Sequence, residues 1–262
     1  MSAQPLPADI FASALAIYQR FAPLFWFGVT NTLLISLSAT VIGLGLGLLF
    51  ASLKQLKIEK KEAIVIKLGK VTAHFLATSY IEIFRGTPMI VQAIFIYHGL
   101  RPIVGWSPLV AGIVIVSINT GAYMAEIIRA GIQSIEKGQY EASRSLGLNH
   151  TRTMIYIMLP QAIKNAFPAI GNEFVVNIKD SAVLNVIGVT ELFFQSSAVA
   201  GIVFRFRDTF LVTALIYLSI TFTVTHILRI IEKKLEIPEG LVGASSSSTA
   251  NFFGFKRKGS RT

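Results

Sequence analysis

The stretch FGVTNTLLISLSATVIGLGLGLLFASL, residues 27–53, runs for 27 residues without one charged side chain. A helix of about 20 apolar residues, each rising about 1.5 Å, is long enough to cross a bilayer. Two other uncharged stretches, residues 107–125 and 209–228, have 19 and 20 residues. The chain is therefore predicted to be an all-α, polytopic membrane protein.

The overall composition agrees with several membrane spans. Hydrophobic residues make up 53% of the 262 residues, and the mean hydropathy is +0.62, which is too apolar for an ordinary soluble domain. The net charge of +10 would suggest a nucleic-acid partner in a soluble protein, but basic residues kept on the cytoplasmic side of a membrane account for it. We expect no nucleic acid and, with no cysteine and four scattered histidines, no metal site. Residues 1–19 lack a basic start, so a signal peptide is not expected.

Residues 71–100 are apolar but are interrupted by Glu82 and by the sequence Arg85-Gly86-Thr87-Pro88. Each half alone is too short to span, whereas one helix of roughly 30 residues is long enough even when it is tilted. Pro88 lacks a backbone donor and disfavours a helical Thr87. We predict one broken span, in which other protein groups or water satisfy the carbonyl groups freed at the break.

Two further apolar segments are less regular. Residues 152–178 contain two prolines, Lys164 and Glu173, and are predicted to be a span that faces protein on most sides. Residues 181–204 carry one charged residue, Glu191. This segment is either a sixth span or a re-entrant helix packed inside the bundle.

Lysine and arginine are distributed unevenly between the segments that join the predicted spans. Residues 51–70, 129–152 and 229–262 carry 17 of them, whereas the segments predicted on the opposite side carry five. Because basic residues are retained in the cytoplasm, the counts predict about five spans, with the N-terminus outside and the C-terminus inside. We divide the chain into an extracytoplasmic segment 1–23, a transmembrane domain 24–236 and a flexible basic cytoplasmic tail 237–262. This tail is either a disordered segment that serves only to fix the orientation or one that rests on anionic lipid.

The polar loop at residues 134–152 carries signals for a short helix. Residues 139–146 are predicted to be helical, with Glu141 in the first turn, where a carboxylate complements the positive helix end. Gly147 suits the left-handed position that stops a helix, and Asn149 or Thr151 could cap the next one. The small or apolar side chains of Ala142, Ser143 and Leu146 would form a narrow face that could enter a groove on a partner. The alternative is a surface helix that merely links two spans.

This loop resembles the cytoplasmic EAA loop of ABC importer permeases. That motif reads Glu-Ala-Ala, three residues, Gly, nine residues and then Ile-x-Leu-Pro. The chain has Glu141-Ala142-Ser143, Gly147 and Ile157-Met158-Leu159-Pro160 in register, with serine in place of the second alanine. Four other segments between residues ~25 and ~235 resemble the polar amino acid permeases, namely 31–33, 83–92, 121–131 and 171–181.

The resemblance implies a multi-pass permease subunit in a bacterial inner membrane. Two permease subunits, identical or homologous, would form the pathway, two ABC ATP-binding subunits would grip the EAA loops, and an extracytoplasmic solute-binding protein would deliver the amino acid. The chain has no G-x-x-x-x-G-K-[ST] phosphate loop, so we expect no enzyme activity in it, and ATP and Mg²⁺ would be bound by the partner ATPase. The residues expected to couple to the ATPase are Glu141, Ala142, Ser143, Leu146, Gly147, Leu159 and Pro160.

Ionisable side chains at membrane depth are costly and are therefore candidates for function. Glu173 and Asn172 are hypothesised to line the amino acid site. Arg85 either stabilises the helix break or contacts a substrate carboxylate, and it could pair with Glu82. The further candidates are Thr87 in the substrate pathway and Glu126 and Arg129 as an anchor or gate, whereas Lys179 and Asp180 are expected at the outer interface.

Two other classes of function compete with an ATP-driven importer. A secondary amino acid transporter or channel would work without ATP, but five spans are few for it and the acidic residues within the spans form no obvious relay. A membrane-embedded enzyme would need a ligand set or a nucleophile–base pair within the spans, and the sequence shows neither.

Overall fold

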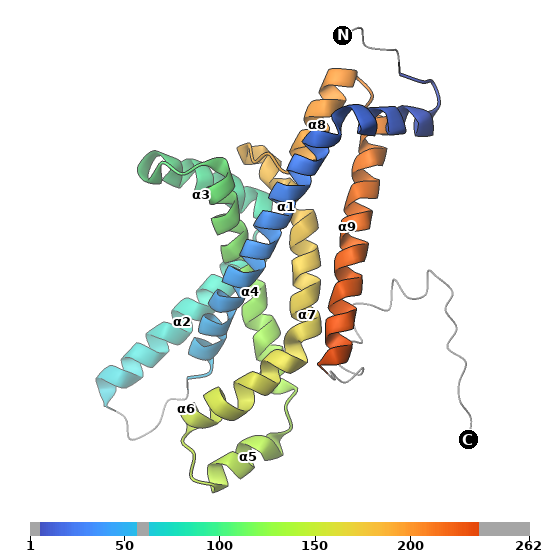
Figure 1. Cartoon of the computed structure of the whole chain (residues 1–262). Coiled ribbons are helices and arrows are strands. Elements are labelled where there is room, and N and C mark those ends of the chain that lie inside the picture. Colours follow the sequence, from blue (N-terminus) through green and yellow to red (C-terminus); the bar gives the residue numbers. More distant parts are fainter. Residues whose placement is uncertain (1–5, 57–62, 236–262) are drawn as a thin grey trace, which may run out of the picture.

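The computed structural model describes residues 6–56 and 63–235 (Figure 1). Every regular element in these residues is helical, which confirms the predicted all-α class. The tail predicted at residues 237–262 lies outside the described residues. The elements are α1 (Ile10–Lys54), α2 (Ile64–Gly86), α3 (Met89–Val104), α4 (Pro108–Gln133), α5 (Lys137–Ser145), α6 (His150–Thr153), the π-helix η1 (Met154–Met158), α7 (Leu159–Asp180), the 3₁₀-helix η2 (Ser181–Ile187), α8 (Leu192–Val203) and α9 (Phe206–Lys234).

Three of the described helices, α1, α4 and α9, are long and apolar enough to cross a membrane. They contain the three uncharged stretches of the sequence. A fourth span is counted if residues His150–Ile187 and α8 form one span, and the two parts are bent by 57°. Residues 181–204 thus form η2 and α8 rather than one straight helix, and the total of five spans stays a prediction.

Helix α1 begins earlier than the predicted span. Asp9 caps it by accepting a hydrogen bond from the backbone N–H of Ala12 at 2.8 Å. Phe21 leaves helical geometry, with φ −116° and ψ 15°, just before Pro23, whose ring cannot donate a backbone hydrogen bond and crowds the preceding turn. The first turns of α1 consequently lie across the top of the molecule in Figure 1. The predicted boundary between residues 23 and 24 falls inside α1, beside this kink.

Two glycines let α1 pack closely against α4. A Cβ atom on Gly43 would lie 2.7 Å from the Cγ2 atom of Thr120, and one on Gly47 would collide with Met124. Gly45, between them, faces open space. The close approach thus follows a four-residue spacing along one face of α1, as in other membrane helix pairs built on small residues.

Helices α2 and α3 are separated by the predicted break. Thr87 is extended, with φ −121° and ψ 144°, because Pro88 disfavours a helical residue before it. The side-chain amide of Gln92 donates to the carbonyl oxygens of Phe84 and Thr87, at 2.9 and 3.0 Å. Asn119 on α4 donates to Phe84 O at 3.2 Å and to the Gln92 side-chain oxygen at 2.9 Å. Protein groups therefore satisfy the freed carbonyls, as predicted.

Helix α8 is anchored at its first residues by a buried acid that the sequence marked only as a lone charge. The carboxyl group of Glu191 accepts from the backbone N–H groups of Phe193 and Phe194, at 2.8 and 2.7 Å. The hydroxyl of Tyr217 on α9 donates to the same carboxyl group at 3.1 Å. Asn31 on α1 donates to Thr190 O at 2.8 Å. These contacts tie the segment between η2 and α8 to α1 and α9.

Candidate substrate cavity and coupling loop

A cavity of about 540 Å³ opens beside the break between α2 and α3. Its walls come from the end of α2, the start of α3, the middle of α4 and the last turns of α7. The lining residues are Arg85, Gly86, Thr87, Pro88, Met89, Asn119, Tyr123, Glu173, Val176 and Asp180. Residues from distant parts of the chain thus surround one polar space, which contains both an arginine and two acids.

The structure brings together three of the five predicted pathway residues, Arg85, Thr87 and Glu173, in this cavity. Glu82 and Asn172 are exposed and do not line it, so their place in the substrate pathway stays a prediction without support from this cavity. Asn172 precedes Glu173 on α7, and neighbouring helical residues point about 100° apart, so only one of them can face the cavity.

Three polar lining residues were missed or misplaced by the sequence. Asp180, expected at the outer interface, lines the cavity with Glu173 because a spacing of seven residues returns a helix to the same face. Asn119 and Tyr123, one turn apart on α4, were not singled out. The sequence could have indicated them, because Asn119 is a strongly polar residue inside the apolar stretch 107–125 and Tyr123, with its polar hydroxyl, follows it by four residues on the same helix face.

Arg85 lies at the edge of the cavity and contacts α4. Its Nη1 atom is 3.9 Å from Oε2 of Glu126, and its guanidinium carbon is 5.5 Å from the centre of the Tyr123 ring. Its side chain is 44% exposed. The pairing with Glu82 that the sequence allowed is not among the ion pairs of residues 6–56 and 63–235. Arg85 is therefore an available cation on the cavity wall.

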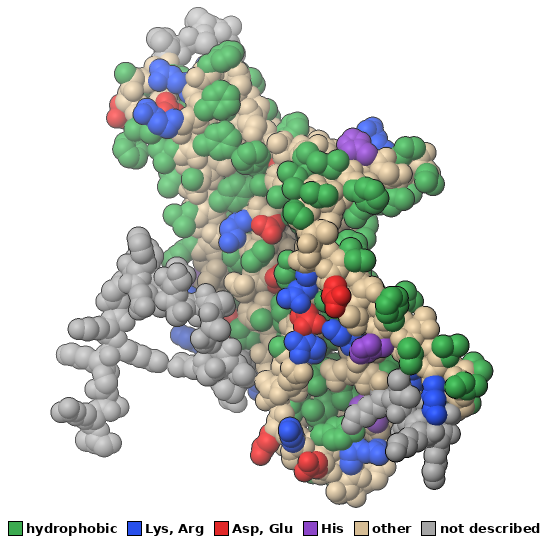
Figure 2. All heavy atoms as spheres, turned by 180° about the vertical axis from the view of Figure 1, so that it is seen from behind, with side chains coloured by type: hydrophobic (Ala, Val, Ile, Leu, Met, Phe, Trp, Pro, Cys, Tyr) green, Lys and Arg blue, Asp and Glu red, His purple; other side chains and the backbone are tan. Residues whose placement is uncertain are grey.

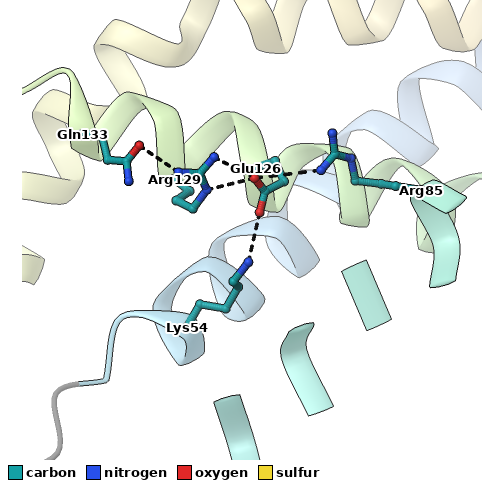
Figure 3. A network of polar contacts seen from close by, with 5 residues as sticks. All are labelled: Lys54, Arg85, Glu126, Arg129 and Gln133. Atoms are coloured by element: carbon teal, nitrogen blue, oxygen red, sulfur yellow. Dashed lines mark hydrogen bonds and ion pairs between the residues drawn. The ribbon is translucent and has the colours of Figure 1, made fainter. Parts of the chain in front are cut away.

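Glu126 is the centre of an ionic cluster that joins three helices (Figure 3). Lys54 Nζ at the end of α1 lies 3.2 Å from Oε1, and Arg129 Nε lies 2.8 Å from Oε2. Arg129 also donates to the side chain of Gln133 at 2.7 Å. Glu126 and Arg129, which the sequence offered as an anchor or gate, thus form an ion pair with each other, and the role of an anchor or gate stays a prediction. The cluster also holds Lys54 and Arg85, which the sequence did not connect to it.

Figure 2 shows acidic and basic side chains gathered midway along one face of the molecule, with mostly hydrophobic surface above them. Charged groups exposed to lipid at membrane depth are costly. Such a face is expected to lie against water or protein rather than against lipid. Within the described residues, no group of three or more His, Asp or Glu side chains could hold a metal ion.

The EAA loop contains α5, which starts at Lys137, two residues before the predicted helix. Glu141 is consequently in the middle of α5 rather than in its first turn, and the expected interaction with the positive helix end is wrong. The predicted stop at Gly147 is confirmed by its φ of +84°. The N–H groups of Gly147 and Leu148 donate to the carbonyls of Arg144 and Ser143, at 3.0 and 3.2 Å, which is the hydrogen-bond pattern of a Schellman motif.

The outward face of α5 differs from the predicted one. Ser143 is only 6% exposed and donates to the carbonyl of Gln139 at 2.6 Å, so it packs against the protein. Ala142 is exposed, and Leu146 is 83% exposed. Ala142 and Leu146 are therefore the accessible part of the predicted face.

The step at Leu159 and Pro160 is part of a widened helical turn. Asn149 rather than Thr151 caps α6, accepting from the N–H of Arg152 at 2.8 Å. In η1, the N–H of Leu159 donates to the carbonyl of Met154. Pro160 has no N–H for the usual bond, and an inserted residue of this kind relieves its clash with the preceding turn. The EAA sequence thus ends in a local irregularity that redirects the chain into α7.

The chain is similar to known transport proteins. Residues 65–237 match the family model described as binding-protein-dependent transport system inner membrane component. The glutamine transport system permease protein GlnP of Escherichia coli (strain K12) is 36% identical over 218 residues, covering 82% of this chain and 94% of that protein. The arginine transport system permease protein ArtQ of Bacillus subtilis (strain 168) is 33% identical over 220 residues, covering 82% and 93%.

Solved structures share the fold. The crystal structure of an amino acid ABC transporter with histidines has a TM-score of 0.74 at 38% identity, covering 87% of this chain and 100% of that one. An inward-facing MetNI methionine ABC transporter has a TM-score of 0.70 at 20% identity, covering 82% and 98%. At the lower identity the likeness concerns the fold alone.

Proposed function

Because this chain belongs to the binding-protein-dependent transport system inner membrane component family and its relatives are amino acid permease proteins, we propose that it carries a polar amino acid across the inner membrane. It is the permease subunit of an ABC importer, and a separate subunit binds ATP and Mg²⁺ and hydrolyses the ATP. The absence of a phosphate-loop motif from the sequence supports this division of labour.

The observation that carries the proposal is the presence of Arg85 and Glu173 in one cavity. A free amino acid carries a carboxylate and an ammonium group, and charge-assisted hydrogen bonds to both are stronger than neutral ones. Arg85 binds the carboxylate and Glu173 binds the ammonium group. Thr87 and Asn119 supply neutral hydrogen-bonding groups on the same wall.

Helix α5 is the part that meets the ATPase. Ala142 and Leu146 present a small exposed face at its end, while Gly147, Leu159 and Pro160 set how the loop enters and leaves. A short helix with an apolar anchor fits a groove on a partner protein. Movement of the ATPase subunits would shift this helix and, through it, the membrane helices.

The complete importer contains two copies of the ATPase, a second permease subunit that is a copy or a homologue of this chain, and an extracytoplasmic solute-binding protein. The N-terminus lies outside and the C-terminus lies in the cytoplasm. Figure 1 supports this orientation, because α5 and the last turns of α1 and α9 lie toward the same end of the molecule. Among the described residues, these parts carry the basic residues Lys54, Lys137, Arg144, Lys233 and Lys234.

Uptake of radiolabelled amino acids by liposomes that contain the permease, its ATPase and its binding protein tests the proposal. Uptake into the liposomes should require ATP in their lumen, on the side of the membrane where the ATPase is bound. Glu173→Gln should raise the KM for uptake about 10- to 100-fold, because a hydrogen bond to a charged group contributes about 1.5–3 kcal/mol. Glu82→Gln is the matched control, since the same change is made on an exposed acid outside the cavity.

Two results would contradict the proposal at different points. Uptake that proceeds without ATP would favour a secondary transporter or a channel. A wild-type KM in Glu173→Gln would remove Glu173 from the substrate site while leaving the importer itself in place.

A further inference from the structure

The inner end of α1 lies between the cavity and the EAA loop. Lys54 is the last residue of α1, and its Nζ atom is 3.2 Å from Oε1 of Glu126. The other carboxylate oxygen of Glu126 faces Arg85 of the cavity wall at 3.9 Å. One carboxylate thus connects a lining residue of the cavity with the end of α1.

The residue that follows α1, Gln55, contacts the EAA loop. Gln55 caps the helix, and carbonyl groups at a helix C-terminus have no intrahelical donor. Nε2 of His150, the first residue of α6, lies 3.4 Å from this carbonyl oxygen. Nδ1 of the same ring lies 3.1 Å from the hydroxyl of Tyr140 on α5.

A neutral His150 ring satisfies both contacts in one tautomer. With the proton on Nε2, the ring donates to Gln55 O, and Nδ1 accepts from the Tyr140 hydroxyl. Tyr140 also packs against the buried cluster that contains Met158 and Ile135. The His150 ring therefore joins the end of α1 to a side chain of α5 that is itself held by packing against buried residues.

The connection at Arg85 is the adjustable one. Lys54 and Arg129 lie within 3.2 Å of Glu126, whereas Arg85 at 3.9 Å is beyond hydrogen-bond distance. A ligand carboxylate can therefore draw Arg85 away without breaking a hydrogen bond. Its departure leaves Glu126 with two cations and removes the repulsion between Arg85 and Lys54, so Lys54 is held more firmly beside Glu126.

We propose that this polar route couples occupancy of the cavity to the position of α5, and that Glu126 is its positioning residue. The proposal rests on the proposed function, since it requires that the cavity binds an amino acid and that α5 meets the ATPase. Coupling between two sites is reciprocal, so a displacement of α5 also changes the affinity of the cavity. The members of the route, in order, are Arg85, Glu126, Lys54, Gln55, His150 and Tyr140.

The test uses the full transporter in liposomes and measures the ratio of amino-acid-stimulated to basal ATPase activity. Glu126→Gln removes the charge but keeps the shape, and Tyr140→Phe removes only the hydroxyl. Each change should lower the ratio by at least about fivefold, the lower end of typical coupling between sites. The double variant should lose no more than the more affected single variant, because both changes interrupt one route.

Variants of His150 separate the two halves of its contact. His150→Gln can keep the hydrogen bond to Gln55 O but loses the one from Tyr140, whereas His150→Asn can keep the bond from Tyr140 but loses the one to Gln55 O. Each variant should therefore lower the ratio. Lys54→Met interrupts the same route if Glu126→Gln does not assemble. Arg205→Gln is the matched control: it breaks an ion pair of 3.8 Å, with Asp208 at the start of α9, and should leave the ratio unchanged.

The outcomes separate this proposal from the proposed function. Wild-type transporter that no amino acid stimulates would contradict the proposed function. Normal wild-type stimulation combined with unchanged ratios in Glu126→Gln and Tyr140→Phe would overturn the route alone. A double variant in which the two fold-losses of the ratio multiply would also overturn it, because changes at independent sites add in free energy and therefore multiply in the ratio.

Discussion

The side-chain amide of Gln92 on α3 donates a hydrogen bond of 2.9 Å to the carbonyl oxygen of Phe84 on α2, across the break between the two helices. The same amide also reaches Thr87 O and Thr87 Oγ1, at 3.0 and 2.8 Å. One buried side chain thus supplies the donor for Phe84 O, whose usual helical donor would be the N–H that Pro88 lacks. The break can be held open beside the cavity because its polar groups already have partners.

Gln92→Leu should destabilise the purified permease. The change removes this donor from the carbonyls of Phe84 and Thr87 and removes the acceptor of the Asn119 amide. Asn119 still donates to Phe84 O, and each lost hydrogen bond costs about 0.5–1.5 kcal/mol. A lower midpoint of thermal unfolding in detergent is the expected result. Gln161→Leu is the control, because that amide makes one bond, to Ile157 O within its own helix. Equal shifts in the two variants would show that the break does not depend on Gln92.

Gly47→Ala should loosen the packing of α1 against α4. The added methyl group would collide with Met124, and overpacking of this kind typically costs about 1–3 kcal/mol. Gly45→Ala is the matched control, since its Cβ meets nothing within 4 Å and alanine favours a helix by about 1 kcal/mol over glycine. Thermal unfolding of both variants should therefore shift in opposite directions. A fall in the midpoint for Gly45→Ala as large as for Gly47→Ala would contradict the packing.

Leu146→Ala should weaken the hold on the ATPase without changing the stability of the isolated permease. The side chain is 83% exposed in the single chain, and burying a leucine at an interface contributes about 1.5–3 kcal/mol, or roughly 10- to 100-fold in affinity. Co-purification of the ATPase, titrated against its concentration, measures the loss. Ser145→Ala, also exposed and on the same helix, should retain the ATPase. Full retention by Leu146→Ala would place the docking face elsewhere.

Asp180→Asn should reduce uptake of arginine or lysine relative to glutamine. The cavity is lined by two acids, Glu173 and Asp180, and one cation, Arg85. If Glu173 binds the ammonium group of the substrate, Asp180 is the acid that remains to bind a cationic side chain, and a neutral side chain does not need it. Loss of one charge-assisted contact changes the ratio of the two kcat/KM values by about tenfold or more. Glu82→Gln should leave this ratio unchanged. An unchanged ratio in Asp180→Asn would mean that Asp180 does not contact the substrate side chain.

The features that depend on a few neighbouring residues could be predicted from the sequence. Pro88 determines the break because its ring and missing N–H act on the residues next to it. Gly147 determines the end of α5 because few residues other than glycine adopt a positive φ without strain. Long uncharged stretches predict α1, α4 and α9 because transfer into a bilayer depends on composition and length.

The features that depend on which way a helix face points could not be predicted. Ser143 packs inward and Leu146 points outward only because α5 rests against the turns that follow it. Glu173 lines the cavity and Asn172 does not, and the sequence alone does not show which face of α7 meets the cavity. Asp180 was misplaced for the same reason.

By itself, the sequence determined the all-α membrane class, the helix break, the end of α5 at Gly147 and the family. These follow from local backbone chemistry, from hydrophobicity and from residue patterns. Only the tertiary structure decided that Arg85, Asn119, Glu173 and Asp180 share one cavity, and that Lys54, Arg85 and Arg129 surround Glu126. Such groupings arise from the packing of helices far apart in the chain, and the relative rotation of those helices is set by close contacts such as Gly47 against Met124.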